Sequence, residues 1–213
     1  EIGVPFSDPV ADGPIIMKAG RKAIDEGSNI NFIFDELIKN KNTISSKYVL
    51  MTYYNILSAY GEKLFLDKCD EAGVYGLIIP DLPYELTKKF KKEFYHHSVK
   101  IISLIAMTAS DARIMQIAKN SEGFIYTVTM NATTGNSGEF HPDLKRKIEY
   151  IKKVSKIPVV AGFGIKNPEH VKDIASVADG IVIGSEIVKR IEIDSRKEFI
   201  TYIKSIRTAL NSF

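Results

Sequence analysis

Short apolar runs alternate with longer amphipathic stretches along this chain, and this alternation limits its fold more than any other feature. The apolar runs are bounded by Gly, Pro, Asp or Asn and cover residues 47–54, 75–80, 99–106, 123–129, 157–163 and 179–184, with a stub at 1–5. The stretches between them carry apolar residues at i, i+3 and i+4, the spacing of a helix that buries one face. Because the runs are apolar at nearly every position, we expect strands covered on both faces, as in a parallel sheet flanked by helices.

A (β/α) barrel explains this order of elements better than an open sheet does. A doubly wound open sheet usually has a GxGxxG turn after its first strand, and this sequence has none. Six clear strands and one stub fit an eight-stranded barrel, which usually needs roughly 250 residues, whose first strand and first helix lie outside this sequence. We therefore expect an α/β fold, a (β/α)8 barrel, with residues 1–213 forming one domain that is incomplete at its N-terminus.

Composition argues against several classes of protein. The 29 basic and 26 acidic residues are spread along the chain and give a net charge of +3, so we do not expect nucleic-acid binding. The sequence lacks the apolar run of about 18 residues that would span a membrane, and it begins without the pattern of a signal peptide. Cys69 is the only cysteine, so we expect a buried apolar role for it, no internal disulfide and a cytoplasmic protein.

The histidines do not predict a metal site. None has metal-ligand spacing or an evident acidic partner in the sequence, so we expect solvated side chains and no bound metal. The four are His96, His97, His141 and His170.

Glycines and a serine follow the last three predicted strands. Gly135 follows the run 123–129, Gly164 follows 157–163, and Gly184 with Ser185 opens the helix after 179–184. Active sites of barrels collect at the carboxyl ends of the strands, and the final loops commonly hold phosphate. Backbone amides in such loops and at a helix N-terminus bind phosphate. Any one of these glycines is equally explained by a tight turn, but their order together predicts a phosphate site.

One carboxylate precedes the proline-rich loop PFSDPVADGP, residues 5–14, and another lies near its end. Glu1 is expected at the end of the stub strand, and Asp12 lies on the loop that its prolines stiffen. A carboxyl group in an apolar pocket donates a proton near neutral pH, whereas one in polar surroundings stays ionised and stabilises positive charge. The two can therefore divide acid–base roles. The alternative is an exposed first residue and an aspartate that caps the following helix.

Apolar side chains at strand ends complete the predicted site. In most proteins such residues are simply core, but a flat aromatic ligand would need a slot of this kind. Beside a phosphate site, the slot indicates an aromatic phosphoester as ligand. The residues are Met51, Ile78, Leu104, Tyr126 and Phe163.

These segments together resemble the tryptophan synthase α subunit family, in its Gram-positive bacterial form, from residue 1 to about residue 190. The matching segments are EIGVPFSDPVADGP, MTYYN, GLIIPDLPYE, FIYTV, TTGNSG, VVAGFGI and ADGIVIGSEIVK. The resemblance implies a lyase that splits indole-3-glycerol phosphate into indole and glyceraldehyde 3-phosphate by a retro-aldol step, without a cofactor of its own. It also implies an α2β2 complex in which a pyridoxal-phosphate-dependent β subunit receives the indole. On this resemblance the barrel's first strand, first helix and most of its second strand lie outside the sequence.

The resemblance also implies roles for individual residues. Glu1 would protonate the indole ring carbon and then assist removal of the glycerol hydroxyl proton, while Asp12 would hold the indole N–H and balance its growing charge. Tyr126 would contact substrate, and Thr134 would meet Asp12 when a lid loop closes. The implied phosphate-binding positions are Gly135, Gly164, Gly184 and Ser185, and the implied walls of the indole pocket are Phe163, Leu104, Ile78 and Met51.

Two other functions stay open at this point. The chain could serve mainly as the regulatory partner of the β subunit, with the PFSDPVADGP loop and the PDLPYE segment as docking surface. It could also be another phosphate-binding barrel enzyme of a neighbouring pathway step.

Overall fold

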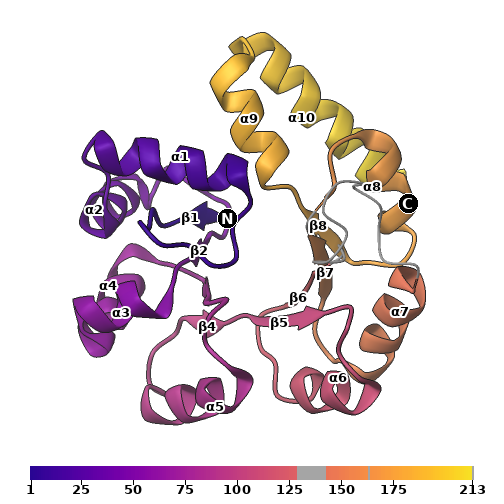
Figure 1. The fold of residues 1–213 in the computed structure, drawn as a ribbon, viewed down its shortest axis with the longest axis horizontal. Coiled ribbons are helices and arrows are strands. Elements are labelled where there is room, and N and C mark those ends of the chain that lie inside the picture. The colour runs from indigo at the N-terminus through magenta and orange to yellow at the C-terminus, as the bar shows by residue number, and fades with distance from the viewer. Residues whose placement is uncertain (129–142, 163, 213) are drawn as a thin grey trace. The chain divides into compact units, whose positions relative to one another are not determined.

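The computed structural model describes residues 1–128, 143–162 and 164–212 of the chain. It divides into two compact units, unit 1 with residues Glu1–Ile102 and unit 2 with residues Ser103–Phe213. Figure 1 shows helices and strands alternating along both. Within the described residues, no helix is long and apolar enough to cross a membrane.

Unit 1 is a parallel four-stranded sheet with five helices. The strands lie in the order β1-β2-β3-β4, and every neighbouring pair is parallel. The strands are β1 (Ile2–Gly3), β2 (Val49–Met51), β3 (Gly76–Ile78) and β4 (Lys100–Ile101). The helices are α1 (Pro14–Asp25), α2 (Ile30–Asn40), α3 (Tyr54–Tyr60), α4 (Glu62–Ala72) and α5 (Tyr84–Glu93).

Unit 2 repeats this plan with a second parallel sheet. Its strands lie in the order β5-β6-β7-β8, and α10 packs on α8. The strands are β5 (Ser103–Ala106), β6 (Ile125–Val128), β7 (Val159–Gly162) and β8 (Gly180–Val182). The helices are α6 (Asp111–Ala118), α7 (Leu144–Val154), α8 (Pro168–Ala175), α9 (Ser185–Ile193) and α10 (Arg196–Leu210).

The core of unit 1 lies between one face of its sheet and the helices. Leu50 and Leu77 are fully buried there against Phe34 and Phe65, whose rings meet edge to face at 5.3 Å. Truncating either leucine to alanine would cost about 2–5 kcal/mol. Because side chains alternate along a strand, the neighbours of Leu50 and Leu77 point to the opposite face of the sheet.

The predicted strands and helices are confirmed in order, except that helix α3 was not predicted and that two of the predicted strands differ clearly from the structure. The run 99–106 forms two strands, because β4 pairs with β3, whereas β5 pairs with β6, and Ile102 lies between them. The run 47–54 is shorter than predicted, since α3 begins at Tyr54. The Asp81 carboxylate, from the loop after β3, accepts the Tyr54 N–H at 2.9 Å and so caps α3 from a distant part of the chain.

Two predictions about single side chains have different outcomes. Cys69 is fully buried, as predicted, and this burial raises the pKa of its thiol. The expectation of a solvated His97 without an acidic partner is wrong. Helix α5 ends at Glu93, earlier than the predicted stretch, and the following turn places His97 Nδ1 2.7 Å from Asp70 Oδ2 with its side chain only 4% exposed.

Candidate active site

Glu1 lies on the face of the unit 1 sheet that points away from the helices. Its neighbour Ile2 packs on the helix-side core, so alternation directs Glu1 to the opposite face with Gly3 and Met51. The predicted position needs a correction, because β1 covers Ile2–Gly3 and Glu1 precedes this strand instead of ending it. The residue as a whole is exposed, yet burial of its carboxyl group raises the pKa. The charge of Asp12 adds to this effect.

Asp12 is held by a tyrosine at the end of the neighbouring strand. The Tyr53 hydroxyl donates to Asp12 Oδ2 at 3.0 Å and accepts the Ala11 N–H at 3.1 Å. The Tyr53 ring also packs on Phe6, with ring centroids 5.2 Å apart. Tyr53 therefore fixes the loop of residues 5–14 at three points. Burial raises the pKa of Asp12, and the bond from Tyr53 opposes that rise.

The alternative role for Asp12, as the N-cap of the next helix, is wrong. Helix α1 begins at Pro14, its N-cap residue is Gly13, and no side chain caps it. Pro14, at the first helical position, has no N–H, so this end of α1 has one unsatisfied donor fewer. The Asp12 carboxylate is instead directed to Tyr53.

Tyr53 is a candidate site residue that the sequence reasoning missed. The signal was present in MTYYN, where Tyr53 lies at the carboxyl end of the predicted run 47–54, the side where barrel sites collect. Burial is the main cause that raises the pKa of Tyr53 to about 12. The hydroxyl therefore stays protonated at neutral pH and remains a hydrogen-bond donor to Asp12.

The predicted apolar wall residues of unit 1 lie together. Met51 and Ile78 are paired in register on adjacent strands and share the sheet face with Glu1. Ile78 is 1% exposed and Met51 is half-buried. The two apolar side chains therefore lie on the sheet face to which strand alternation directs Glu1, and an apolar environment is the one expected of a carboxyl group that donates a proton.

The unit 2 sheet brings Leu104 and Tyr126 together. The two residues are paired in register on β5 and β6, and Tyr126 is 6% exposed. The Tyr126 ring lies over Gly162 on β7, where an added Cβ would be 2.6 Å from Tyr126 Cζ. Only glycine leaves room for this tyrosine, so Gly162 determines where the Tyr126 side chain lies.

The described phosphate-binding candidates lie on two segments of unit 2. Gly164 follows β7 with a φ of +80°, a conformation that glycine adopts easily. Helix α9 begins at Ser185 with Gly184 as its N-cap residue, which confirms the predicted helix start. Because the first N–H groups of a helix lack intrahelical partners, this end of α9 can donate to an anion.

Some of the predicted residues cannot be placed. Thr134, Gly135 and Phe163 lie outside the described residues. The others fall into two groups, each within one unit: Glu1, Asp12, Met51 and Ile78 in unit 1, and Leu104, Tyr126, Gly164, Gly184 and Ser185 in unit 2. Across residues 1–128, 143–162 and 164–212, no group of three or more His, Cys, Asp or Glu side chains is placed to hold a metal ion.

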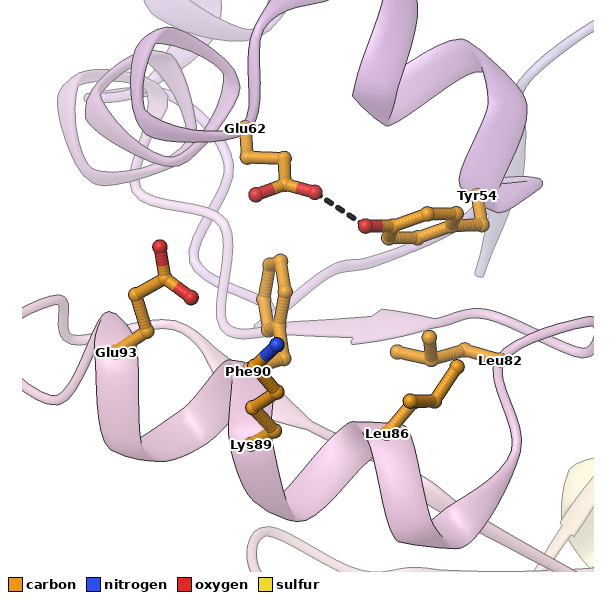
Figure 2. A pocket seen from close by; sticks show the side chains of 7 residues that line it. All are labelled: Tyr54, Glu62, Leu82, Leu86, Lys89, Phe90 and Glu93. Atoms are coloured by element: carbon orange, nitrogen blue, oxygen red, sulfur yellow. Dashed lines mark hydrogen bonds between the residues drawn. The ribbon is translucent and has the colours of Figure 1, made fainter.

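A separate pocket of about 210 Å³ lies in unit 1 among α3, α4 and α5, and contains none of the predicted site residues. In Figure 2, Leu82, Leu86 and Phe90 lie below a hydrogen bond from the Tyr54 hydroxyl to the Glu62 carboxylate. This bond is the main cause that raises the pKa of Tyr54. The hydroxyl groups of the adjacent residues Tyr53 and Tyr54 thus have different partners, since that of Tyr53 donates to Asp12 and that of Tyr54 donates to Glu62.

Comparison with known proteins identifies the family. The family model described as "Tryptophan synthase alpha chain" matches residues 1–211. A "Tryptophan synthase alpha chain" from Staphylococcus epidermidis is 98% identical over 212 residues, which cover all of this chain and 87% of that relative.

Solved structures agree with this match. "Tryptophan synthase subunit alpha" from Campylobacter jejuni is 33% identical with a TM-score of 0.84, covering 96% of this chain and 82% of the other. A tryptophan synthase complex from Pyrococcus furiosus matches with 30% identity and a TM-score of 0.84, covering 99% of this chain and 85% of the matched chain. These similarities confirm the predicted α/β fold class of the (β/α) barrels. The chain belongs to the tryptophan synthase alpha chain family.

Proposed function

We propose that this chain cleaves indole-3-glycerol phosphate to indole and glyceraldehyde 3-phosphate in tryptophan biosynthesis, with Glu1 and Asp12 as its catalytic carboxylates. Membership of the tryptophan synthase alpha chain family supports the reaction. An electrostatic observation supports the assignment of these two residues as the catalytic carboxylates. Burial raises the pKa of the Glu1 carboxyl, and the charge of Asp12, which Tyr53 holds in place, raises it further.

The two carboxylates divide the chemistry. Glu1 donates a proton to the indole ring carbon that carries the glycerol chain, and Asp12 accepts the indole N–H as positive charge develops on the ring. Removal of the proton from the hydroxyl on the adjacent glycerol carbon turns that carbon into an aldehyde. The carbon–carbon bond breaks, and its electron pair returns to the indole ring.

The proposed substrate-binding residues rest on the family resemblance. It assigns Met51, Ile78, Leu104 and Phe163 to the walls of the indole pocket and Tyr126 to substrate contact. The resemblance also assigns Thr134 to substrate binding. The phosphate group is bound by backbone amides at Gly135, Gly164 and Gly184 and by Ser185. Support for the described phosphate positions comes from the left-handed turn at Gly164 and the start of α9.

The chain acts as the partner of a β subunit, which binds the pyridoxal phosphate. We propose an α2β2 assembly, no cofactor in the α chain itself, and a cytoplasmic location, because the single cysteine requires no oxidising compartment. The loop of residues 5–14, in which Val10 is 79% exposed, is proposed as part of the contact surface. The same observation favours the second candidate function, in which regulation of the β subunit is the main role.

A Glu1→Gln substitution separates the two functions. The variant should lower indole release from indole-3-glycerol phosphate by about 10²–10⁴-fold, because it removes the proton donor. Stimulation of the β subunit's own reaction by the added variant should remain measurable. Glu26→Gln, an exposed position after α1, is the matched control and should leave both activities unchanged. Wild-type indole release by Glu1→Gln would exclude Glu1 as the acid–base group.

A further inference from the structure

The loop after β7, which carries Gly164, is anchored at two of its backbone carbonyl groups. One bond comes from His170 on α8 and the other from Tyr202 on α10. Both side chains belong to unit 2, as does the whole loop. Neither was a candidate site residue from the sequence, because nothing local relates a tyrosine on the last helix to this turn.

His170 reaches back from the first turn of α8 to Gly164. Its own N–H donates to the N-cap side chain of Asn167 at 2.9 Å, which fixes the residue at the helix start. Its ring nitrogen Nδ1 lies 3.2 Å from the Gly164 carbonyl oxygen. Because a carbonyl oxygen only accepts hydrogen bonds, Nδ1 carries the proton in this contact.

Tyr202 contacts the loop and α9 at once. It is buried, at 7% exposure, and its hydroxyl donates to the Lys166 carbonyl oxygen at 3.0 Å. The Arg190 guanidinium lies over the face of its ring, with Cζ 4.0 Å from the ring centroid. Arg190 is held in that place along α9 by Glu186 at 2.8 Å and Asp194 at 3.0 Å. One side chain thus joins the Gly164 loop to the helix that begins at Ser185.

We infer that His170 and Tyr202 are positioning residues, which hold the Gly164 loop and the start of α9 in the arrangement that binds the substrate phosphate. The inference rests on the proposed phosphate role of Gly164, Gly184 and Ser185. A peptide unit is planar, so the bond to the Gly164 carbonyl also fixes the direction of the Ile165 N–H, and the bond to the Lys166 carbonyl fixes that of the Asn167 N–H. Glycine at positive φ has little conformational restraint of its own. Bonds to Gly164 and Lys166 supply that restraint, and a preorganised loop binds an anion without a further entropic cost.

The test compares variants that remove one bond each. Tyr202→Phe keeps the ring under Arg190 and deletes only the hydroxyl, while His170→Leu deletes the ring donor. We expect each to weaken binding of inorganic phosphate, measured by calorimetry, by about threefold to tenfold, the range for loss of one hydrogen bond. The KM for indole-3-glycerol phosphate should rise by a similar factor, with kcat changed less than twofold. Affinity for indole, which has no phosphate, should stay unchanged.

Rescue and control variants exclude a merely structural effect. His170→Asn retains an N–H donor at the δ position and should bind phosphate within about twofold of wild type. Tyr150→Phe removes a tyrosine hydroxyl from α7 of the same unit and should have no effect on phosphate binding. Equal weakening by Tyr150→Phe, or failure of His170→Asn to restore binding, would overturn the inference. If Tyr202→Phe unfolds, the two His170 variants still decide the matter.

A Ser185→Ala variant, measured alongside, distinguishes the inference from the function on which it rests. If Ser185→Ala weakens phosphate binding but Tyr202→Phe and His170→Leu do not, the positioning role is wrong and the phosphate site stands. If Ser185→Ala and Gly164→Ala both bind phosphate as wild type does, the proposed phosphate positions are wrong, and the positioning role with them.

Discussion

The Tyr53 hydroxyl lies 3.0 Å from Asp12 Oδ2, although 41 residues separate the two in sequence. The same hydroxyl accepts the Ala11 N–H, and its ring packs on Phe6. One side chain at the end of β2 therefore determines where the proposed catalytic aspartate lies. Four features of the molecule lead to testable predictions: this relationship, the packing at Gly162, the buried Lys147 and the half-buried Asp70.

Removing the Tyr53 hydroxyl should impair the reaction most at low pH. Burial raises the pKa of Asp12 and the bond from Tyr53 lowers it, so Tyr53→Phe should raise that pKa further. The ionised Asp12 is the form proposed to accept the indole N–H. The acidic limb of the kcat/KM profile should therefore move to higher pH, and kcat/KM at neutral pH should fall about tenfold. An unchanged acidic limb would show that Asp12 is not the group that titrates.

A methyl group at position 162 should displace Tyr126. The added Cβ of Gly162→Ala would lie 2.6 Å from Tyr126 Cζ, closer than real side chains pack, and the overpacking should cost about 1–3 kcal/mol of unfolding free energy. Urea unfolding measures the loss. At Gly180 an added Cβ would meet Val160 Cγ2 at 3.5 Å, an ordinary contact, so Gly180→Ala should cost less. Adding Tyr126→Val to Gly162→Ala should remove most of the penalty, and full additivity of the two changes would contradict this cause.

Lys147 should stabilise unit 2 through its buried ammonium group. The side chain projects from α7 and donates to the carbonyl oxygens of Met107 and of Ala109, the latter at 2.7 Å, in the loop after β5. Lys147→Met keeps the chain length but leaves these carbonyls without the donor, which should cost about 1–3 kcal/mol. Lys145 on the same helix forms an exposed ion pair with Asp173. Lys145→Met should change stability by less than about 1 kcal/mol, and an equal loss from both variants would refute the assignment.

Asp70 should contribute stability that disappears in acid. Burial alone would raise its pKa, but hydrogen bonds from Ser98 and His97 outweigh this and hold the pKa below the usual value of 3.8. The unfolded chain therefore binds its proton at higher pH, so the contribution is complete above the unfolded pKa and is lost as pH falls through the folded pKa. Asp70→Asn should lower the thermal midpoint at pH 5 to 7 and differ little from wild type near pH 2.

An exposed aspartate is the control for that measurement. Asp35 lies on the solvent side of α2, and Asp35→Asn should leave the thermal midpoint nearly unchanged at every pH. A difference between Asp70→Asn and wild type that grows as pH falls would have the wrong sign for this linkage.

The local spacing of apolar residues predicted most of the fold, and the predictions that were wrong share a physical cause. The strands and helices follow from apolar spacing, which backbone geometry sets within a few residues. The start of α3 could not be predicted in this way, because the cap of Tyr54 comes from Asp81, 27 residues away. His97 was misjudged for the same reason, since its partner Asp70 lies on a different helix. The one-domain expectation for residues 1–213 and the roles of the site residues stay predictions.

Residue types and the order of the strands predicted which residues belong to the candidate site, but not which of them are in contact. Carboxylates, glycines and apolar residues at strand ends could be named, because parallel strands bring their carboxyl ends to one edge. The sequence could not predict which tyrosine of MTYYN holds Asp12, because the side chains of adjacent residues at a strand end point in different directions. Tyr202 carried no signal at all in the sequence.

The amino-acid order alone determined the succession of strands and helices, the positions of the glycines that are predicted to bind phosphate, and the family resemblance, because each depends on residues close together in the chain. Tertiary structure decided that Tyr53 bonds Asp12, that Asp81 caps α3, and that His170 and Tyr202 anchor the loop of Gly164. Those contacts join segments that meet only after the sheets form. Their geometry depends on strand register and helix packing, which no short stretch of sequence contains.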